Sequence, residues 1–155
     1  MARRKEGAFI EIELENGKYS YGRILQHASY AFYDIYSDRK ISDVSAIQKG
    51  NVIFIIAVYK YAITKNRWKI IGIEELETKY RLLPNKFMQD IIDPSLFSIY
   101  NPNTGEMIPA TKEECFGLER SAVWEPEHVE DRLIDHFENR PNKWVESLKI
   151  TNPRF

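Results

Sequence analysis

Two alternating segments joined by an Asn-Gly pair constrain the fold of this chain more than any other feature. In residues 8–14 apolar side chains alternate with acidic ones, and this period of two predicts a strand buried on one face. Asn16-Gly17 follows, a pair typical of tight hairpin turns because both positions tolerate positive φ. Residues 19–26 predict the returning strand, with Gly22 as a bulge or bend. An antiparallel sheet is therefore expected from the start of the chain.

Further segments have the composition of strands, and they are residues 30–36, 51–59, 67–73, 87–92 and 96–100. The run at 51–59 is continuously apolar and rich in β-branched residues, which is typical of a central, fully buried strand. Between the strands, residues 37–50 are polar and predict a loop with a short turn, and residues 63–66 predict a turn. Asp93-Pro94 separates the last two strands, and residues 101–105 have turn composition.

The C-terminal third changes to helical patterns. Thr111 and Glu114 fit a capping box. Pro126 can open a helix without losing a hydrogen bond, and from there to residue 139 the apolar residues fall on one side of the helix: Val129, Leu133, Ile134 and Phe137. Residues 142–148 predict a further short turn or helix. We therefore predict a single domain over residues 1–155, of class α+β and mainly β. It is a curled antiparallel sheet, or a small partly open barrel, with a C-terminal amphipathic helix packed on it.

Composition excludes several classes of protein. The longest apolar run, residues 52–59, is far shorter than the ~20 residues that cross a bilayer. The basic N-terminus leads into an alternating strand rather than an apolar stretch, so we expect no signal peptide. Cys115 is the only cysteine, and a single free thiol is typical of a reducing cytosol. The formal charge of -1 argues against a dedicated DNA-binding protein. We expect a cytoplasmic protein with no membrane segment.

Residue types suited to catalysis or metal binding are present but form no known motif. His128 and His136 lack the i, i+4 spacing of a zinc-binding helix, and His27 is remote from both in sequence. No phosphate-binding glycine loop is present, and no histidine lies close to Cys115 in the sequence. We therefore expect no catalytic activity, metal or cofactor. A small hydrolase using Glu130 with His136 or Cys115 stays open, and it requires these groups to converge on a pocket.

Aromatic residues crowd the second and third predicted strands: Tyr19, Tyr21, Tyr30, Phe32, Tyr33 and Tyr36. On a curled sheet, exposed aromatic side chains beside basic ones can stack nucleic-acid bases. More often such residues fill the core of a small sheet, and we favour that interpretation. Exposure of Tyr33 or Tyr36 beside a basic strip would instead favour a single-stranded nucleic-acid-binding module or another β-barrel interaction module.

Acidic residues are concentrated in one segment. Residues 113–138 contain nine acids and two arginines and carry -7, whereas the whole chain carries -1. Such a face can steer a basic partner, although a solvated helix face is the commoner cause of a charge run. Glu130 falls among the apolar residues on the helical wheel, where a carboxylate needs a partner. We predict that Arg120 or another arginine neutralises Glu130.

The chain resembles the immunity protein 26 family over roughly residues 4–148. Residues 114–133 (ECFGLERSAVWEPEHVEDRL) resemble the C-terminal signature of that family. Residues 7–9 (GAF) with 19–25 (YSYGRIL) are similar to its opening hairpin, and residues 31–36 (AFYDIY) to its third strand. The resemblance implies an immunity protein of a bacterial polymorphic toxin system, which binds a toxin domain in the cytoplasm. It implies no catalytic residue, metal or cofactor.

From this resemblance we expect stoichiometric binding that covers the active site of a cognate toxin domain, with a nuclease as one candidate. The oligomeric state and the identity of the toxin stay open. The acids expected to contact the partner lie outward, or at the border, on the helical wheel: Glu127, Asp131, Asp135 and Glu138. The signature residues expected to be architectural are Arg120, Trp124, Glu130 and Trp144.

Overall fold

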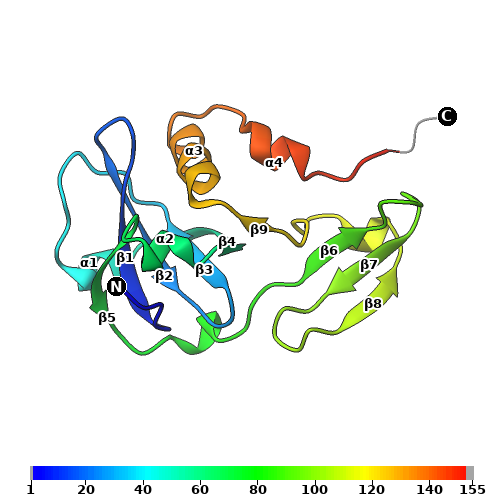
Figure 1. Ribbon diagram of the computed structural model, residues 1–155, viewed down its shortest axis with the longest axis horizontal. Coiled ribbons are helices and arrows are strands. Elements are labelled where there is room, and N and C mark those ends of the chain that lie inside the picture. Colours follow the sequence, from blue (N-terminus) through cyan, green and yellow to red (C-terminus); the bar gives the residue numbers. More distant parts are fainter. Residues whose placement is uncertain (1, 153–155) are drawn as a thin grey trace.

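The computed structural model describes residues 2–152, and within them the chain forms a larger and a smaller β-sheet (Figure 1). The larger sheet has the strand order β5-β1-β2-β3-β4-β9 and the smaller sheet the order β6-β7-β8. The strands of the larger sheet are β1 (Ala8–Glu13), β2 (Tyr19–Ile24), β3 (Ser29–Tyr33), β4 (Val52–Val58), β5 (Lys69–Ile73) and β9 (Val123–Trp124). Those of the smaller sheet are β6 (Lys86–Gln89), β7 (Phe97–Tyr100) and β8 (Met107–Ala110). The predicted class, α+β and mainly β, is confirmed.

Short helices connect and cover the sheets. They are α1 (Val44–Gln48), α2 (Tyr61–Thr64), α3 (Pro126–Phe137) and α4 (Lys143–Ser147), with 3-10 turns η1 (Thr78–Tyr80) and η2 (Glu113–Cys115). The predicted amphipathic helix is confirmed as α3, which lies along the larger sheet and is followed by α4 toward the smaller one (Figure 1). Its buried residues Val129, Leu133 and Ile134 join the main hydrophobic core of the sheet.

The larger sheet is open rather than closed into a barrel. Across the described strands its edges are β5 and β9, which do not pair with each other. The predicted hairpin is present, with β1 antiparallel to β2 and Gly17 at φ +82° in the turn between them. At the other edge β9 pairs with β4 in parallel, because the chain crosses to the smaller sheet and returns before it forms this strand. The sheet is therefore antiparallel except at this last pair.

The predicted bulge at Gly22 is wrong. Gly22 sits in regular register between Ile10 and Phe32, and the irregularities fall instead between Phe9 and Ile10 and between Phe32 and Tyr33. A Cβ atom at Gly22 would lie 2.9 Å from the carbonyl oxygen of Ala31 and 3.1 Å from Cδ1 of Ile10. The glycine therefore permits close packing against its neighbours and does not bend the strand.

Burial on both faces distinguishes β1 from the predicted half-buried strand. Ile10 and Ile12 face the core beneath α3, whereas Phe9 on the other face packs with Tyr21 and Ile47. Ile47 belongs to α1, which lies within the predicted loop of residues 37–50. The second face is buried because this helix covers it, and a pattern within β1 cannot indicate a cover supplied from elsewhere in the chain.

The smaller sheet also departs from the sequence expectation. Strand β6 ends at Gln89 rather than residue 92, since the chain turns at Asp90. Strand β8 was not predicted because four residues including Pro109 carry too little pattern, although proline is compatible with this edge position.

Two short helical segments were predicted with different accuracy. Residues 61–64 form α2, where we predicted only a turn at 63–66. The predicted capping box is confirmed at η2, where Thr111 and Glu114 exchange hydrogen bonds of 2.9 and 3.2 Å.

A buried arginine on β2 connects the segment before β1 with the segment after β5. The Arg23 side chain is fully buried, and its Nε donates to the carbonyl oxygen of Gly7 at 2.7 Å. Its Nη2 donates to the Glu74 carbonyl at 2.8 Å, and its Nη1 pairs with the Glu77 carboxylate at 3.2 Å. The guanidinium also lies over the Phe9 ring, 4.0 Å from the centroid. These contacts hold the segment before β1 against the segment after β5.

At this junction, Gly7 is the residue whose substitution should be least tolerated. It has φ +86°, and an added Cβ would lie 2.2 Å from the carbonyl oxygen of Glu74. Gly7→Ala should therefore lower the free energy of unfolding by about 3 kcal/mol or more, from backbone strain and steric overlap. Gly17→Ala is the matched control because Gly17 has φ +82° and no atom within 4 Å of an added Cβ, and it should lose about 1 kcal/mol. Equal losses in urea unfolding would contradict the packing argument.

Candidate interaction surface

The buried carboxylate of α3 is neutralised as predicted, but by a different arginine. Arg67 donates from Nε and Nη2 to the two carboxylate oxygens of Glu130 at 2.7 and 3.0 Å. The indole N–H of Trp68 donates to Glu130 at 2.9 Å. Trp68 is itself buried and meets the rings of Tyr30 and Phe32 edge-on. Glu130 thereby fixes α3 to the aromatic core of the larger sheet.

Two of the four acids proposed for partner binding lie on the side of α3 that α4 covers. Asp131 accepts a 3.0 Å hydrogen bond from the indole N–H of Trp144, and Asp135 accepts one of 3.0 Å from the Asn142 side chain. Asp135 also pairs with Arg140 at 3.2 Å. Both aspartates are therefore half-buried rather than fully exposed as the helical wheel suggests, and their contact with a partner stays a prediction. A wheel drawn for one helix does not contain the second helix that packs against it.

The other two acids are more accessible and are held by tyrosines. Glu138 is exposed and accepts a 2.7 Å hydrogen bond from the Tyr36 hydroxyl. Glu127 is half-buried, accepts a 2.7 Å hydrogen bond from the Tyr61 hydroxyl and pairs with Arg67 at 3.4 Å. The Tyr61 hydrogen bond and the nearby Arg67 charge lower the pKa of the Glu127 carboxyl, so this side chain is ionised at neutral pH. The acidic surface of α3 is therefore ordered by internal contacts.

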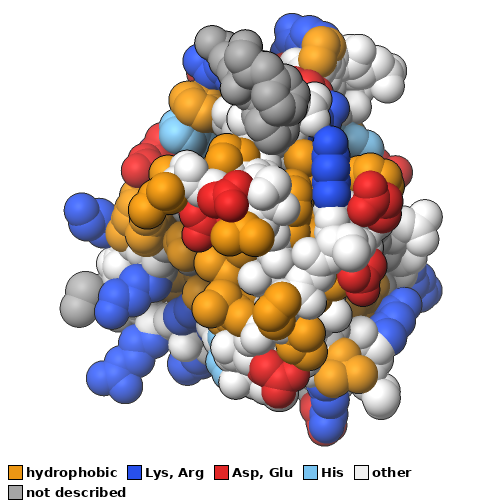
Figure 2. Space-filling model, turned by 90° about the vertical axis from the view of Figure 1, so that its right-hand side faces the viewer, with side chains coloured by type: hydrophobic (Ala, Val, Ile, Leu, Met, Phe, Trp, Pro, Cys, Tyr) orange, Lys and Arg blue, Asp and Glu red, His pale blue; other side chains and the backbone are white. Residues whose placement is uncertain are grey.

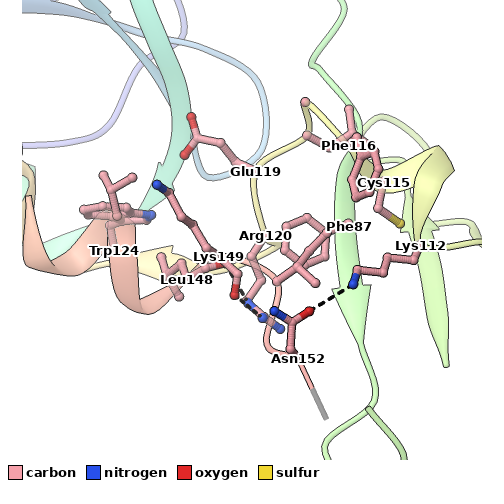
Figure 3. Close-up of a pocket in the computed structure, with 14 residues that line it drawn as sticks. Phe87, Lys112, Cys115, Phe116, Glu119, Arg120, Trp124, Leu148, Lys149 and Asn152 are labelled. Carbon is pink, nitrogen blue, oxygen red and sulfur yellow. Dashed lines mark hydrogen bonds between the residues drawn. The ribbon is translucent and has the colours of Figure 1, made fainter. Parts of the chain in front are cut away.

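The remaining signature residues make internal contacts that connect distant segments. Arg120 donates to the carbonyl oxygens of Leu148 and Lys149, each at 3.0 Å, and to the Gln89 side chain at 3.1 Å. Arg120 thus ties the segment after α4 to Gln89 at the end of β6. Figure 3 shows Arg120 beside Leu148 and Lys149. Trp124 is buried beneath the guanidinium of Arg132. Trp144 stacks on the ring of His128, with 3.5 Å between the ring centroids.

The junction between the two sheets is hollowed on both sides. One cavity, of about 570 Å³, lies beside Arg120 and is lined by apolar side chains that include Phe87 and Phe116, with Lys112 at its margin (Figure 3). The other, of about 620 Å³, lies on the opposite face of the smaller sheet. Its lining is mixed: Ala57, Met88, Met107 and Val123 are apolar, whereas Ser29, Asn103 and Ser121 are polar and the Lys86 side chain lies among them.

Hydrophobic side chains gather on the exposed face of the smaller sheet (Figure 2). They are most exposed in the turn between β6 and β7, where Ile91 and Ile92 are 96 % and 94 % accessible. The strand predicted over residues 87–92 includes both isoleucines, so their exposure was not predicted. The available signal was two aliphatic residues enclosed by Asp90 and Asp93-Pro94, a pattern typical of a turn.

Groups suited to catalysis are dispersed among different partners. Cys115 is buried with Phe87 in the core of the smaller sheet, and His136 lies 3.3 Å from Asp34 at the surface. Glu130 is held by Arg67, so the convergence that the hydrolase alternative requires is not seen. In the described part of the chain, no three His, Cys, Asp or Glu side chains are grouped to hold a metal ion.

The tyrosines that would indicate a base-stacking surface are occupied in packing. Tyr33 is fully buried, and Tyr36 stacks on Phe137 with 4.6 Å between the ring centroids. The structure therefore does not favour the nucleic-acid-binding alternative. No helix within residues 2–152 has the length and apolar character that spanning a membrane requires.

Glu130 should contribute far more to stability than its neighbour on the same helix. Glu130→Ala leaves the buried Trp68 N–H without an acceptor and should lower the free energy of unfolding by about 3 kcal/mol. Glu127→Ala is the matched control, since Glu127 also pairs with Arg67 but its side chain is 43 % exposed. It should lose less than about 1 kcal/mol. Similar losses for both variants in urea unfolding would contradict a special role for Glu130.

The thiol of Cys115 should react only when the smaller sheet opens. Burial raises the pKa of this thiol, so at a given pH a smaller fraction is the reactive thiolate than in an unfolded chain. Reaction with a chromogenic disulfide reagent at mildly alkaline pH should be about 100-fold slower for the folded protein than in concentrated guanidinium chloride. Rapid stoichiometric labelling of the folded protein would show that Cys115 is accessible and reopen its role as a nucleophile.

Comparison with known families assigns the chain to one of them. No curated protein and no solved structure matches it significantly. The family Immunity protein 26 matches residues 5–98, which is more than half of the chain. This region contains the opening hairpin and the third strand, which carry part of the resemblance. The C-terminal signature at residues 114–133, which carries the rest, lies beyond the match and is not tested by it. The chain belongs to the Immunity protein 26 family.

Proposed function

We propose that this protein neutralises a cognate bacterial toxin domain by binding it stoichiometrically in the cytoplasm and covering its active site. Membership in the Immunity protein 26 family is the observation that carries the proposal, since an immunity protein acts as an inhibitor of a toxin. The dispersal of Cys115, His136 and Glu130 among separate partners supports an inhibitor that acts by binding rather than by catalysis.

The acidic surface of α3 supplies an electrostatic rationale for covering the active site of a nuclease. Such an enzyme holds phosphates with Lys and Arg, and carboxylates on an inhibitor can occupy the same basic site. Glu138 and Glu127 are the more accessible acids, while Asp131 and Asp135 add negative charge from beneath α4. Because tyrosine hydroxyls and other donors already hold these carboxylates, little side-chain freedom is lost when a basic partner binds.

Inhibition should show a stoichiometric end point. The candidate partner is a toxin domain encoded by a neighbouring gene, which the proposal predicts, and it is expressed with and without this protein. Cells that express the toxin domain alone should stop growing, and co-expression of this protein should restore growth. In a titration of purified toxin activity, inhibition should be complete at one equivalent, because each copy covers one active site. Inactivation by substoichiometric amounts would indicate catalysis. Absence of a complex in calorimetry, with toxin activity unaffected by excess protein, would overturn the proposed function.

A further inference from the structure

The turn between β6 and β7 exposes adjacent aliphatic side chains to a degree that folding alone does not explain. Ile91 and Ile92 are almost wholly accessible, and Leu96 at the end of the same turn is 57 % exposed. Isolated exposed apolar residues are common on protein surfaces, whereas a group of them at a protruding turn is typical of an interaction site. The residues from Asp90 to Leu96 are called the β6–β7 tip below.

Hydrogen bonds from its own side chains hold the β6–β7 tip in a single conformation. One carboxylate oxygen of Asp90 accepts hydrogen bonds from the backbone N–H groups of Ile92 and Asp93, both at 2.8 Å. One oxygen of Asp93 accepts the backbone N–H and the hydroxyl of Ser95, at 3.1 and 2.6 Å. The Asp90 N–H also donates to the carbonyl of Leu96 at 2.9 Å. The isoleucines are therefore presented by an ordered turn, which reduces the entropy lost on binding.

The strand that leads into the β6–β7 tip also exposes apolar side chains on one face of the smaller sheet. Met88 on β6 pairs with Ser98 on β7, which in turn pairs with Pro109 on β8. Met88 is 38 % exposed, and Met107 is 57 % exposed on the same face. This face leads into the cavity lined by Met88, Met107 and Val123. Figure 2 shows patches of hydrophobic side chains on this side of the molecule, with acidic and basic side chains between them. A partner that covers the tip can therefore also bury the adjoining face.

Charge indicates the chemistry of the partner. The β6–β7 tip contains Asp90 and Asp93 and no basic residue. Hydrogen bonds from Ser95 lower the pKa of the Asp93 carboxyl, so it is ionised at neutral pH. Among the described residues, no hydrogen bond reaches the second carboxylate oxygen of either aspartate. These oxygens are therefore available to Lys or Arg side chains.

We propose that the β6–β7 tip anchors this protein in the toxin domain: Ile91 and Ile92 enter an apolar cleft whose border carries Lys or Arg residues that face Asp90 and Asp93. This inference rests on the proposed function and names the surface that performs it. Two copies of the tip placed together would bring four carboxylates close, which disfavours self-association through it. The same charges disfavour an anionic membrane surface.

The test measures binding of the full chain to a catalytically inactive form of the toxin domain that the growth and titration experiments above identify as its partner. Replacing both isoleucines, Ile91→Ser with Ile92→Ser, should raise Kd by about 100-fold. Leu82→Ser is the matched control, because Leu82 is 73 % exposed and precedes β6, at the opposite end of that strand from the tip. It should leave Kd unchanged. All variants should keep the wild-type melting temperature, since the replaced side chains are exposed.

The charges are tested separately by isosteric substitution. Asp90→Asn with Asp93→Asn keeps an oxygen acceptor for each turn hydrogen bond and removes the charge, so it should slow association several-fold at low salt. Unchanged Kd for the isoleucine variant, alongside tight binding by the wild type, would overturn the anchor and leave the proposed function standing. Failure of the wild type to bind would overturn the proposed function itself. Dimerisation of the free protein that the isoleucine substitutions abolish would assign the tip to self-association and also overturn the anchor.

Discussion

The Glu130 carboxylate is the contact on which the arrangement of the C-terminal third depends. A carboxylate among apolar side chains is unfavourable unless several donors reach it, and Arg67 and Trp68 together supply three N–H groups. Because Trp68 is packed in the aromatic core of the larger sheet, this contact fixes both the position and the rotation of α3. The positions of the elements that follow α3 depend in turn on contacts with α3 and with one another. Asp131 holds Trp144 of α4, and Arg120 then connects the segment after α4 to β6.

This series of polar contacts separates two surfaces of different chemistry. The accessible acids of α3 lie over the larger sheet and are ordered by tyrosine hydroxyls, as at Glu138. Exposed apolar residues lie on the smaller sheet, and the most exposed of them are Ile91 and Ile92 in the turn between β6 and β7. An interface that uses both kinds of surface follows the usual anatomy of protein complexes, with aliphatic anchors at the centre and charged groups at the rim that accelerate association. Arg120 links the parts of the chain that carry the two surfaces, through its hydrogen bonds to Leu148, Lys149 and Gln89.

Local chemistry explains which sequence predictions succeed. The Asn16-Gly17 turn, the Pro126 start of α3 and the exchange of hydrogen bonds between Thr111 and Glu114 each depend on neighbours within a few residues. The need of Glu130 for an arginine was also evident, because a wheel shows a carboxylate among apolar positions. Its partner was not, since Arg67 lies 63 residues earlier and only packing brings it to α3.

The sequence by itself therefore determined the class of the fold, the hairpin, the amphipathic helix and the family resemblance, because periodicity and turn chemistry act over short distances. The tertiary structure alone decided which surfaces remain accessible. Asp131 and Asp135 point outward on an isolated helix, yet contacts with Trp144 and Asn142 leave them only half-exposed. β1 is buried on both faces because α1 lies on it. Ile91 and Ile92 have strand-like composition, but Asp90 turns the chain and exposes them. Exposure is a property of the whole packed chain, and no local pattern contains the element that will cover a given face.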